Sequence, residues 1–418
     1  MNDPLQWSKA EQQALAAHHR GANLRHQART RRQRARLTLL RLAAPLGRVR
    51  SRAVNTPPQR ILVIRPDHLG DVLFSTPALH ALRSAWPSAH ITALVGPWSA
   101  GILRHNPDID TLRTLPFPGF ARQAAPRPWQ PYPLLWHEAQ RLRTERFDLA
   151  VVLRFDHWWG AWLAQLAAIP QRVGYAMAEC QPFLTHAAPY QAGRHEVLQN
   201  LTLIETATGA HVTAEPRLTF PVTAAAAAWA QDWRHTAGLA EQPYVVVHPG
   251  AGAPVKLWPA PAWAAVIDRL LSRGLAVVLT GSTTEAGLVS DIVRQVHGPV
   301  HTLAGGTDLD QLAALMQQCR LTVGLDSGPM HLAVAVGAPT VHLYGPVAVA
   351  TFGPWGNPAH HRVVTSDWTC VPCNRLDFAA AELPWHPCVR AITPTDVLQA
   401  IDTVLLDSEP IQPELRVR

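Results

Sequence analysis

The 418-residue sequence has few cysteines and no long apolar run, and both absences restrict its class. Five cysteines are too few and too unevenly spread for a disulfide framework, which favours a reducing compartment. No stretch offers the roughly 18 uninterrupted apolar residues that a membrane-spanning helix needs. The first residues also lack the apolar block and cleavage site of a secretory signal peptide. We therefore expect a cytoplasmic protein.

Acidic residues are absent between Gln12 and Pro66, so the N-terminal region is strongly basic. Residues 1–60 hold thirteen of the 37 lysines and arginines but only two of the 30 acids. Six arginines lead into or interrupt a leucine-rich stretch: Arg29, Arg31, Arg32, Arg34, Arg36 and Arg41. Two interpretations stay open, a solvated extension and peripheral attachment to the anionic inner-membrane surface. Because no aromatic residues lie among the arginines, we expect no nucleic-acid partner.

The rest of the chain has the composition of a large globular protein. The whole sequence is 47% apolar and 16% charged, and its length is about two to three times that of a usual domain. From residue 60 onward, short β-rich apolar runs alternate with helical patterns, which is typical of parallel sheets with crossover helices. We expect an α/β protein with four parts: a basic extension at 1–56, Rossmann-like domains at 57–220 and 221–390, and a C-terminal helix and tail at 391–418.

The pattern predicts the individual elements of both halves. In the first half, strands are expected at 60–65, 90–95 and 148–154, and helices at 70–85, 98–105, 133–146, 157–168 and 195–209. In the second half, strands are expected at 243–248, 275–280, 320–325 and 339–344, and helices at 223–238 and 394–405. The proline-rich residues 116–133 indicate an inserted loop. Residues 210–223 resemble an interdomain connector with a short strand of its own.

Three polar loops each follow an apolar strand, and they are the candidate site. They read RPDHLGD from Arg65, HPGAGAPVKLWP from His248 and LDSGPMH from Leu325. Open α/β sheets bind ligands outside the carboxyl ends of their strands. We therefore expect these loops to meet in a cleft between the two domains.

Four motifs, in order, resemble glycosyltransferase family 9, the heptosyltransferases of lipopolysaccharide core assembly. They are ILVIRPDHLGDVLFSTPALHALRSAWPSAHIT, VVVHPGAGAPVKLWP, LTGSTTE and GLDSGPMHLAVAVGAPTVHLYGP. The resemblance covers residues 60 to about 404 and leaves out the basic extension. It implies a GT-B fold with the acceptor on the first domain and the nucleotide sugar on the second. It also implies neither a metal nor any other cofactor.

The resemblance assigns the catalytic base to Asp71. In an inverting transfer, the acceptor hydroxyl loses a proton as it attacks the anomeric carbon, and a carboxylate within reach can take that proton. Gly70 would let the acceptor approach, Asp67 is the second candidate base, and His68 departs from the family pattern. An acid at this position can also serve only as a helix cap. A helix N-terminus would lower the pKa of Asp71 unless desolvation offsets that effect.

The second loop supplies candidate donor-binding residues. Gly250 and Gly252 would let the backbone approach a ligand closely, and Ala251 between them belongs to the same candidate loop. Lys256 would place a positive charge on the donor diphosphate, although a loop lysine can equally be a solvated side chain. Glu285 would by resemblance bind the ribose hydroxyls. The S-x-x-E pattern that it completes is also a capping box.

The third loop opens a helix directly after a strand. Backbone N–H groups from Ser327 and Gly328 onward would therefore point a helix N-terminus at an anion. Asp326 would by resemblance accept hydrogen bonds from sugar hydroxyls, or it caps the helix. His331 either lies near the phosphates or packs in the core.

Cysteines near the C-terminus leave a metal site open as an alternative. Cys370, Cys373 and Cys388, with His386, have the residue types of a zinc site. A second Cys-x2-Cys pair is missing, so we expect thiols that hold no metal.

The most specific hypothesis is an inverting, metal-independent glycosyltransferase. It would move heptose from ADP-heptose onto a lipopolysaccharide core acceptor at the inner membrane. One alternative is a family member that uses another nucleotide sugar or a non-lipid acceptor. Another is a nucleotide-sugar binding protein without turnover. The presence of Asp71, Lys256 and Asp326 argues against the latter.

Overall fold

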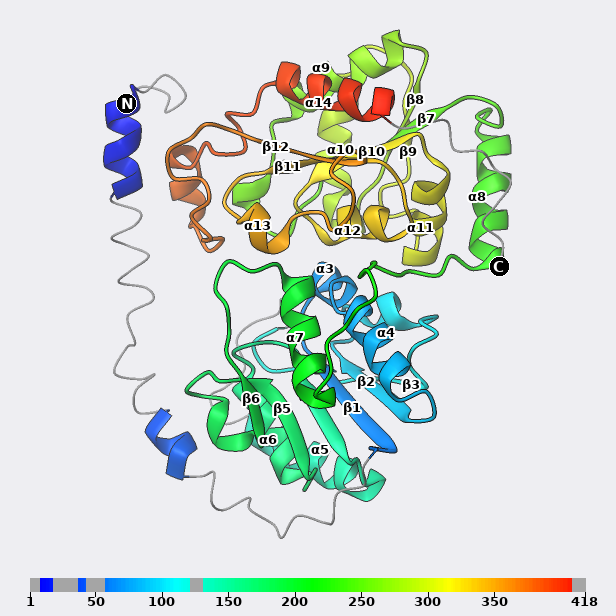
Figure 1. The fold of residues 1–418 in the computed structure, drawn as a ribbon. Coiled ribbons are helices and arrows are strands. Elements are labelled where there is room, and N and C mark those ends of the chain that lie inside the picture. The colour runs from blue at the N-terminus through cyan, green and yellow to red at the C-terminus, as the bar shows by residue number, and fades with distance from the viewer. Residues whose placement is uncertain (1–7, 18–36, 43–56, 121–130, 408–418) are drawn as a thin grey trace. The chain divides into compact units, whose positions relative to one another are not determined.

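The computed structural model describes residues 8–17, 37–42, 57–120 and 131–407, which form two compact units (Figure 1). The first domain comprises the described residues between 28 and 219. The second comprises those from Phe220 onward together with residues 8–17. Each domain is built on one six-stranded parallel sheet with helices packed against it, so the α/β class predicted from the sequence is confirmed.

The first domain contains the sheet β3-β2-β1-β4-β5-β6, in which all neighbouring strands are parallel. Its strands are β1 (Arg60–Arg65), β2 (His90–Val95), β3 (Thr111–Thr114), β4 (Leu149–Val152), β5 (Gln171–Tyr175) and β6 (His186–Ala188). Its helices are α3 (Leu69–Leu73), α4 (Thr76–Ala85), α5 (Pro131–Glu145), α6 (Trp158–Leu166) and α7 (Glu196–Thr208), with the short 3-10 turns η3 (Ala100–Leu103) and η4 (Gln181–Phe183). The central strands read as continuous apolar runs because both of their faces are buried.

The second domain contains the sheet β12-β11-β10-β7-β8-β9, again all parallel. Its strands are β7 (Tyr244–His248), β8 (Ala276–Leu279), β9 (His301–Thr302), β10 (Leu321–Leu325), β11 (Thr340–Tyr344) and β12 (His361–Thr365). Its helices are α8 (Ala224–Thr236), α9 (Ala260–Ser272), α10 (Ala286–Val293), α11 (Leu309–Gln318), α12 (Gly328–Ala335), α13 (Val349–Phe352) and α14 (Pro394–Asp407). Three 3-10 turns complete the domain: η5 (Pro254–Lys256), η6 (Thr283–Glu285) and η7 (Ala380–Trp385).

Both sheets have the same strand order when each is counted from its own first strand. In each, the first strand pairs with the second on one side and with the fourth on the other, as in a Rossmann fold. The order therefore reverses between β1 and β4 and between β7 and β10. Loops that leave these strands diverge to opposite faces of the sheet and leave a crevice where ligands bind.

Helix 70–85, expected to be continuous, is divided into α3 and α4. Pro77 lies in the first turn of α4 and has no N–H with which to continue the hydrogen-bond ladder. The side-chain hydroxyls of Ser75 and Thr76 instead donate to the carbonyls of Val72 and Leu73, at 2.6 and 2.8 Å. The prediction of one continuous helix was therefore wrong. The interruption lies between Leu73, the last residue of α3, and Thr76, the first of α4.

Other expected elements differ from the structure in smaller ways. Residues 100–103 form a 3-10 turn in place of the helix expected at 98–105. The connector at 210–223 has no strand, and the N–H of Thr219 donates to the Thr76 hydroxyl at 3.0 Å. Helix α14 buries Val397, Ile401 and Val404 in the core of the second domain, so it is not a separate C-terminal part. The five strands that the pattern missed are short or lie toward the sheet edges: β3, β5, β6, β9 and β12.

The basic extension contains two described helical segments, at 9–17 and 37–42. Leu40 is 3% exposed and belongs to the apolar core of the first domain, whereas Leu39 and Leu42 are 65% and 67% exposed. Only part of the leucine-rich stretch is therefore available to a membrane surface. Arg29, Arg31, Arg32, Arg34 and Arg36 lie outside the described residues, as do residues 121–130 of the expected insertion.

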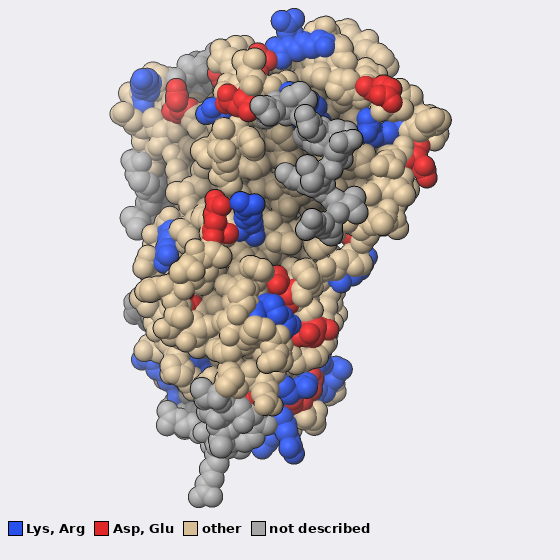
Figure 2. Space-filling view, turned by 45° about the vertical axis from the view of Figure 1, so that its right-hand side comes forward, with Lys and Arg blue, Asp and Glu red and all other residues tan. Residues whose placement is uncertain are grey.

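Charged side chains are sparse and mixed on the face seen in Figure 2, where most of the surface carries neither sign. This matches a sequence in which 16% of residues are charged and much of the positive excess is N-terminal. In the part of the chain that the structure describes, no helix is both long and apolar enough to cross a membrane.

A buried carboxylate fixes the start of β1, and its removal should destabilise the first domain. Asp148 is 1% exposed and accepts the N–H groups of Gln59 and Arg60 at 2.9 and 3.0 Å. Asp148→Ala leaves both donors without this acceptor, so we expect the free energy of unfolding to fall by about 3 kcal/mol. Urea denaturation followed by circular dichroism measures this loss. Asp148→Asn keeps an acceptor oxygen and should lose less, whereas equal stability of all three proteins would contradict the role.

Candidate active site

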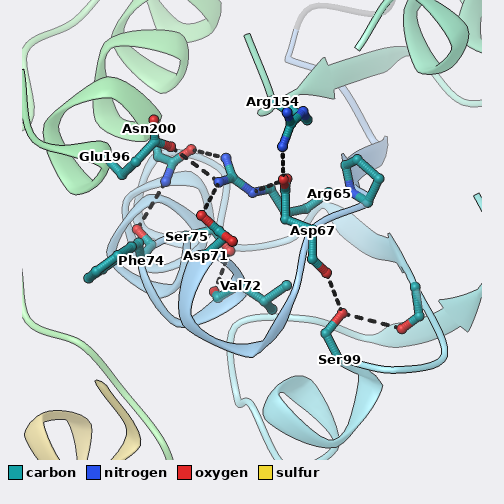
Figure 3. Close-up of polar contacts among 12 residues, drawn as sticks. Arg65, Asp67, Asp71, Val72, Phe74, Ser75, Ser99, Arg154, Glu196 and Asn200 are labelled. Atoms are coloured by element: carbon teal, nitrogen blue, oxygen red, sulfur yellow. Dashed lines mark hydrogen bonds and ion pairs between the residues drawn. The ribbon is translucent and has the colours of Figure 1, made fainter. Parts of the chain in front are cut away.

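Asp71 lies in the third position of α3, directly after the loop that leaves β1. The loop is fixed by its backbone, because the carbonyl of Asp67 accepts the indole N–H of Trp98 at 3.0 Å and the Ser99 hydroxyl at 2.9 Å. His68 is the N-cap residue of α3, and its side chain makes no capping hydrogen bond. Asp71 instead faces the side chain of Arg65, so its contacts are those of a charged cluster (Figure 3).

Arg65 is the centre of this cluster. Its guanidinium is 3% exposed, and its Nε lies 2.8 Å from Asp67. One terminal nitrogen donates to Asn200 at 3.1 Å. The other lies 3.1 Å from Glu196 and 3.5 Å from Asp71. Arg65 thus binds residues of the β1 loop, α3 and α7 at once.

Arg154 follows β4 and brings a second positive charge to the same place. Its guanidinium pairs with Oδ1 of Asp67, whereas Arg65 contacts Oδ2, and it also pairs with Asp156 at 2.6 Å. It also lies over the ring of Phe120, 5.0 Å from the centroid. Since β1 and β4 are neighbours, the cluster lies at the point where the strand order reverses.

The pKa values of Asp67, in the β1 loop, and Asp71, in α3, shift in opposite directions. Burial alone would raise the pKa of Asp67, but Arg65 and Arg154 outweigh it and hold that pKa below its usual value. Burial raises the pKa of Asp71 to about 7, and the charges of Asp67 and Glu196 add to this effect while Arg65 opposes it. The side chain of Asp71 is 30% exposed, against 3% for Asp67. Asp71 is therefore the more basic and more accessible carboxylate of the pair.

A helix N-terminus is expected to lower the pKa of Asp71, but burial of the side chain outweighs this effect. Helix α3 has only five residues, so its dipole is small. Gly70 and His68 are partly exposed beside Asp71, and the His68 ring lies 5.9 Å from that of Trp98. The position of His68 assigns it no chemical role.

In the second domain, Lys256 and Asp326 form an ion pair across the other reversal of strand order. Lys256 Nζ lies 2.6 Å from Asp326 Oδ2, joining the loop after β7 to the end of β10. Burial would raise the pKa of Asp326, but the neighbouring His331 and the charge of Lys256 hold it at about 2. Asp326 therefore does not cap α12, whose N-cap residue is Ser327.

Glu285 and the glycine-rich loop are in direct contact. The carboxylate accepts both the N–H and the hydroxyl of Ser282, at 2.7 and 2.8 Å, so the capping box is present. A Cβ on Gly250 would lie 2.0 Å from Glu285 Oε1, which explains the glycine at this position. Gly252 is exposed, and Ala251 packs partly against the core.

At the start of α12, Ser327 has a hydroxyl without a protein partner among the described residues. Its Oγ is buried and makes no hydrogen bond to any described residue. Gly328 begins the helix and Pro329 follows it. His331 is 3% exposed and lies 3.9 Å from Asp326, so its ring contributes to the buried side of this site.

The cysteine-rich segment has no metal-binding geometry. Among the described residues, no group of three or more His, Cys, Asp or Glu side chains is arranged to hold a metal ion. His386 is 7% exposed, and its ring lies 3.6 Å from that of Phe378. Burial raises the pKa of Cys388 to about 12, which disfavours the thiolate that a metal would require.

Sequence reasoning missed four residues of the first cluster: Arg65, Arg154, Glu196 and Asn200. Both arginines stand at the ends of expected apolar strands, so the rule that led to Asp71 could have found them. Glu196 and Asn200 are separated by one helical turn on α7. Nothing in the local sequence of α7 shows which of its faces contacts Arg65. Glu196 and Arg65 are 131 residues apart in the chain.

Comparisons with known proteins find consistent relatives. The model of Glycosyltransferase family 9 (heptosyltransferase) matches residues 135–378. Lipopolysaccharide heptosyltransferase 3 of Escherichia coli is 30% identical over 298 residues, which cover 69% of this chain and 84% of the relative. A family 9 glycosyl transferase from Veillonella parvula has a TM-score of 0.70 at 25% identity, covering 86% of this chain and 99% of its own. The E. coli ADP-heptose lps heptosyltransferase II has a TM-score of 0.66 at 24% identity, covering 83% and 98%.

The ion pair of the second domain predicts a pH-dependent loss of stability. Lys256→Met leaves the buried Asp326 without its cation, so we expect a loss of about 3 kcal/mol at pH 7. Because the pKa of folded Asp326, about 2, lies below the ordinary 3.8, this contribution is present above pH 4 and disappears as the pH falls toward 2. Urea denaturation at pH 7 and at lower pH measures the difference. Adding Asp326→Asn should restore part of the loss, and a pH-independent loss would contradict the interpretation.

Proposed function

This chain belongs to glycosyltransferase family 9, has the GT-B fold and is a glycosyltransferase, and from this premise we propose the reaction that it catalyses. We propose an inverting transfer of heptose from ADP-heptose onto a lipopolysaccharide core acceptor, without a metal ion. The names of two relatives support the sugar and the acceptor, since one is a lipopolysaccharide heptosyltransferase and the other an ADP-heptose heptosyltransferase.

The observation that supports the proposal most directly is the combination of solvent access and raised pKa at Asp71. An acceptor hydroxyl needs a general base that can be reached from solvent and whose pKa lies near the working pH. Asp71 meets both requirements, with a 30% exposed side chain and a pKa raised to about 7. Asp67 meets neither, because two arginines bind it and its side chain is 3% exposed.

On the donor side, we assign the diphosphate to Lys256 and the start of α12. The ammonium supplies positive charge, and the N–H groups of the first helical turn supply oriented dipoles. Asp326, which stays ionised, accepts hydrogen bonds from sugar hydroxyls while it pairs with Lys256. Glu285 lies against the Gly250 loop and would approach the ribose with the carboxylate oxygen that faces this glycine.

Removal of the base should abolish transfer and preserve donor binding. Asp71→Asn keeps the size of the side chain but cannot accept a proton, so we expect kcat to fall about 10²- to 10⁴-fold. Transfer from ADP-heptose to a purified core acceptor measures kcat, and calorimetry with ADP measures donor binding. A variant that keeps more than a tenth of the activity would exclude Asp71 as the base. If other nucleotide sugars in a donor panel support transfer and ADP-heptose does not, ADP-heptose would be excluded as the donor.

A chelator should leave the reaction unchanged if fixed protein charges stabilise the leaving diphosphate. We expect the same initial rate with and without excess EDTA, and no stimulation by added magnesium or manganese. Lys256→Gln, in contrast, should lower kcat/KM by at least tenfold because the ammonium charge is lost. Loss of activity in EDTA that a divalent cation restores would overturn the metal-independent mechanism.

A further inference from the structure

Arg65 is surrounded by more carboxylates than the cluster can neutralise. Three acids, Asp67, Asp71 and Glu196, share the two guanidinium groups of Arg65 and Arg154. Arg154 also pairs with Asp156, which reduces the charge that it can contribute. Figure 3 shows Asp71 and Glu196 approaching Arg65 from different elements. One acid of the three is therefore incompletely paired.

Geometry identifies Asp71 as the incompletely paired acid. A single terminal nitrogen of Arg65 serves both Glu196, at 3.1 Å, and Asp71, at 3.5 Å. Glu196 is the closer partner and its side chain is 7% exposed, so water competes little for it. Asp67 takes the Nε of Arg65 at 2.8 Å. Asp67 and Glu196 therefore make the closer contacts with Arg65, and the contact of Asp71 is the longest of the three.

Helix α7 holds this arrangement in place. Asn200 accepts from Arg65 at 3.1 Å, and its amide donates to the carbonyl of Phe74 at 3.1 Å, just where α3 ends. Asn200 is 0% exposed, so α7 fixes both the guanidinium and the end of the helix that carries Asp71. The position of Glu196, one turn earlier on the same helix, is fixed together with it.

We propose that Glu196 and Asp67 are positioning residues that hold Arg65 in competition with Asp71, so that Asp71 keeps its capacity to accept a proton. This inference rests on the proposed function of Asp71 as the base. An arginine that paired fully with Asp71 would stabilise its carboxylate and make it a weak base. A site without Arg65 would leave the buried Glu196 without the cation that it pairs with and Asp67 with Arg154 alone. The competition allows a buried cation and a basic carboxylate to coexist.

The charged groups that face Asp71 give a definite sign for the test. They are Arg65 from β1, Asp67 from the loop, Arg154 after β4 and Glu196 from α7. Glu196→Gln removes a negative charge but keeps an oxygen that can accept from Arg65. Asp71 then receives a larger share of the arginine's charge. Its pKa should fall, so the rate should reach its plateau at lower pH.

The experiment compares pH profiles of kcat/KM for the wild type, Glu196→Gln and Glu145→Gln. The control, Glu145, also pairs with an arginine of this domain, Arg113, outside the cluster. We expect the acidic limb of the Glu196→Gln profile to move about one pH unit downward and its plateau to fall about threefold, as for a weaker base. The control profile should stay unchanged.

A second readout does not depend on turnover. Carbon-13 NMR of aspartate carboxyls follows the titration of Asp71 directly, with its signal assigned by its loss in Asp71→Asn. Downward movement of both the titration and the limb in Glu196→Gln supports the inference. An unchanged titration in a folded variant overturns it, even if the enzyme transfers sugar normally. A shifted titration in a protein that transfers no sugar supports the inference and refutes the proposed function.

Asp67→Asn serves if Glu196→Gln does not fold, as judged by circular dichroism. It also removes a negative charge that faces Asp71 and keeps an oxygen for Arg65 and Arg154. The titration of Asp71 should again move downward. An unchanged or raised pKa of Asp71 in this variant would overturn the inference.

Discussion

The buried guanidinium of Arg65 is the interaction on which the first-domain site depends. A charge at 3% exposure is stable only when carboxylates and hydrogen-bond acceptors surround it, and these come from the β1 loop, α3 and α7. The positive charge of Arg65, which stabilises acids around it, also stabilises Asp71 close to this arginine. The raised pKa of Asp71 then reflects its burial there, to which the charges of Asp67 and Glu196 add. Stability and chemistry are therefore coupled through one side chain.

The strand order explains why a charged cluster can form at this place in each domain. Where the order reverses, the loops after β1 and β4, and after β7 and β10, bring polar side chains close together. In the first domain, Arg154 after β4 meets Asp67 after β1. In the second, Asp326 after β10 meets Lys256, which follows β7. Both pairs join neighbouring strands across a reversal.

Much of this could be predicted from the sequence, because continuous apolar strands and the polar loops behind them are local features. The positions of β1, β2, β7, β10 and α14 agree with the apolar pattern to within a few residues. The short edge strands could not be found, since they bury little and lack a strong period. The role of Glu196 could not be found either, because a contact across 131 residues has no local signature. Pro77 does indicate the division of α3 from α4, because a proline has no N–H with which to continue a helix.

The described residues of each charged cluster belong to a single domain, and this has a consequence for how such a protein can change. Residues that hold Asp71 come entirely from one sheet and its helices, while Lys256 and Asp326 belong to the other. If each domain binds one substrate, as we propose, preferences for the two substrates can diverge separately among descendants of one ancestor, and a chimaera that joins the halves of two relatives would inherit each preference from its own parent.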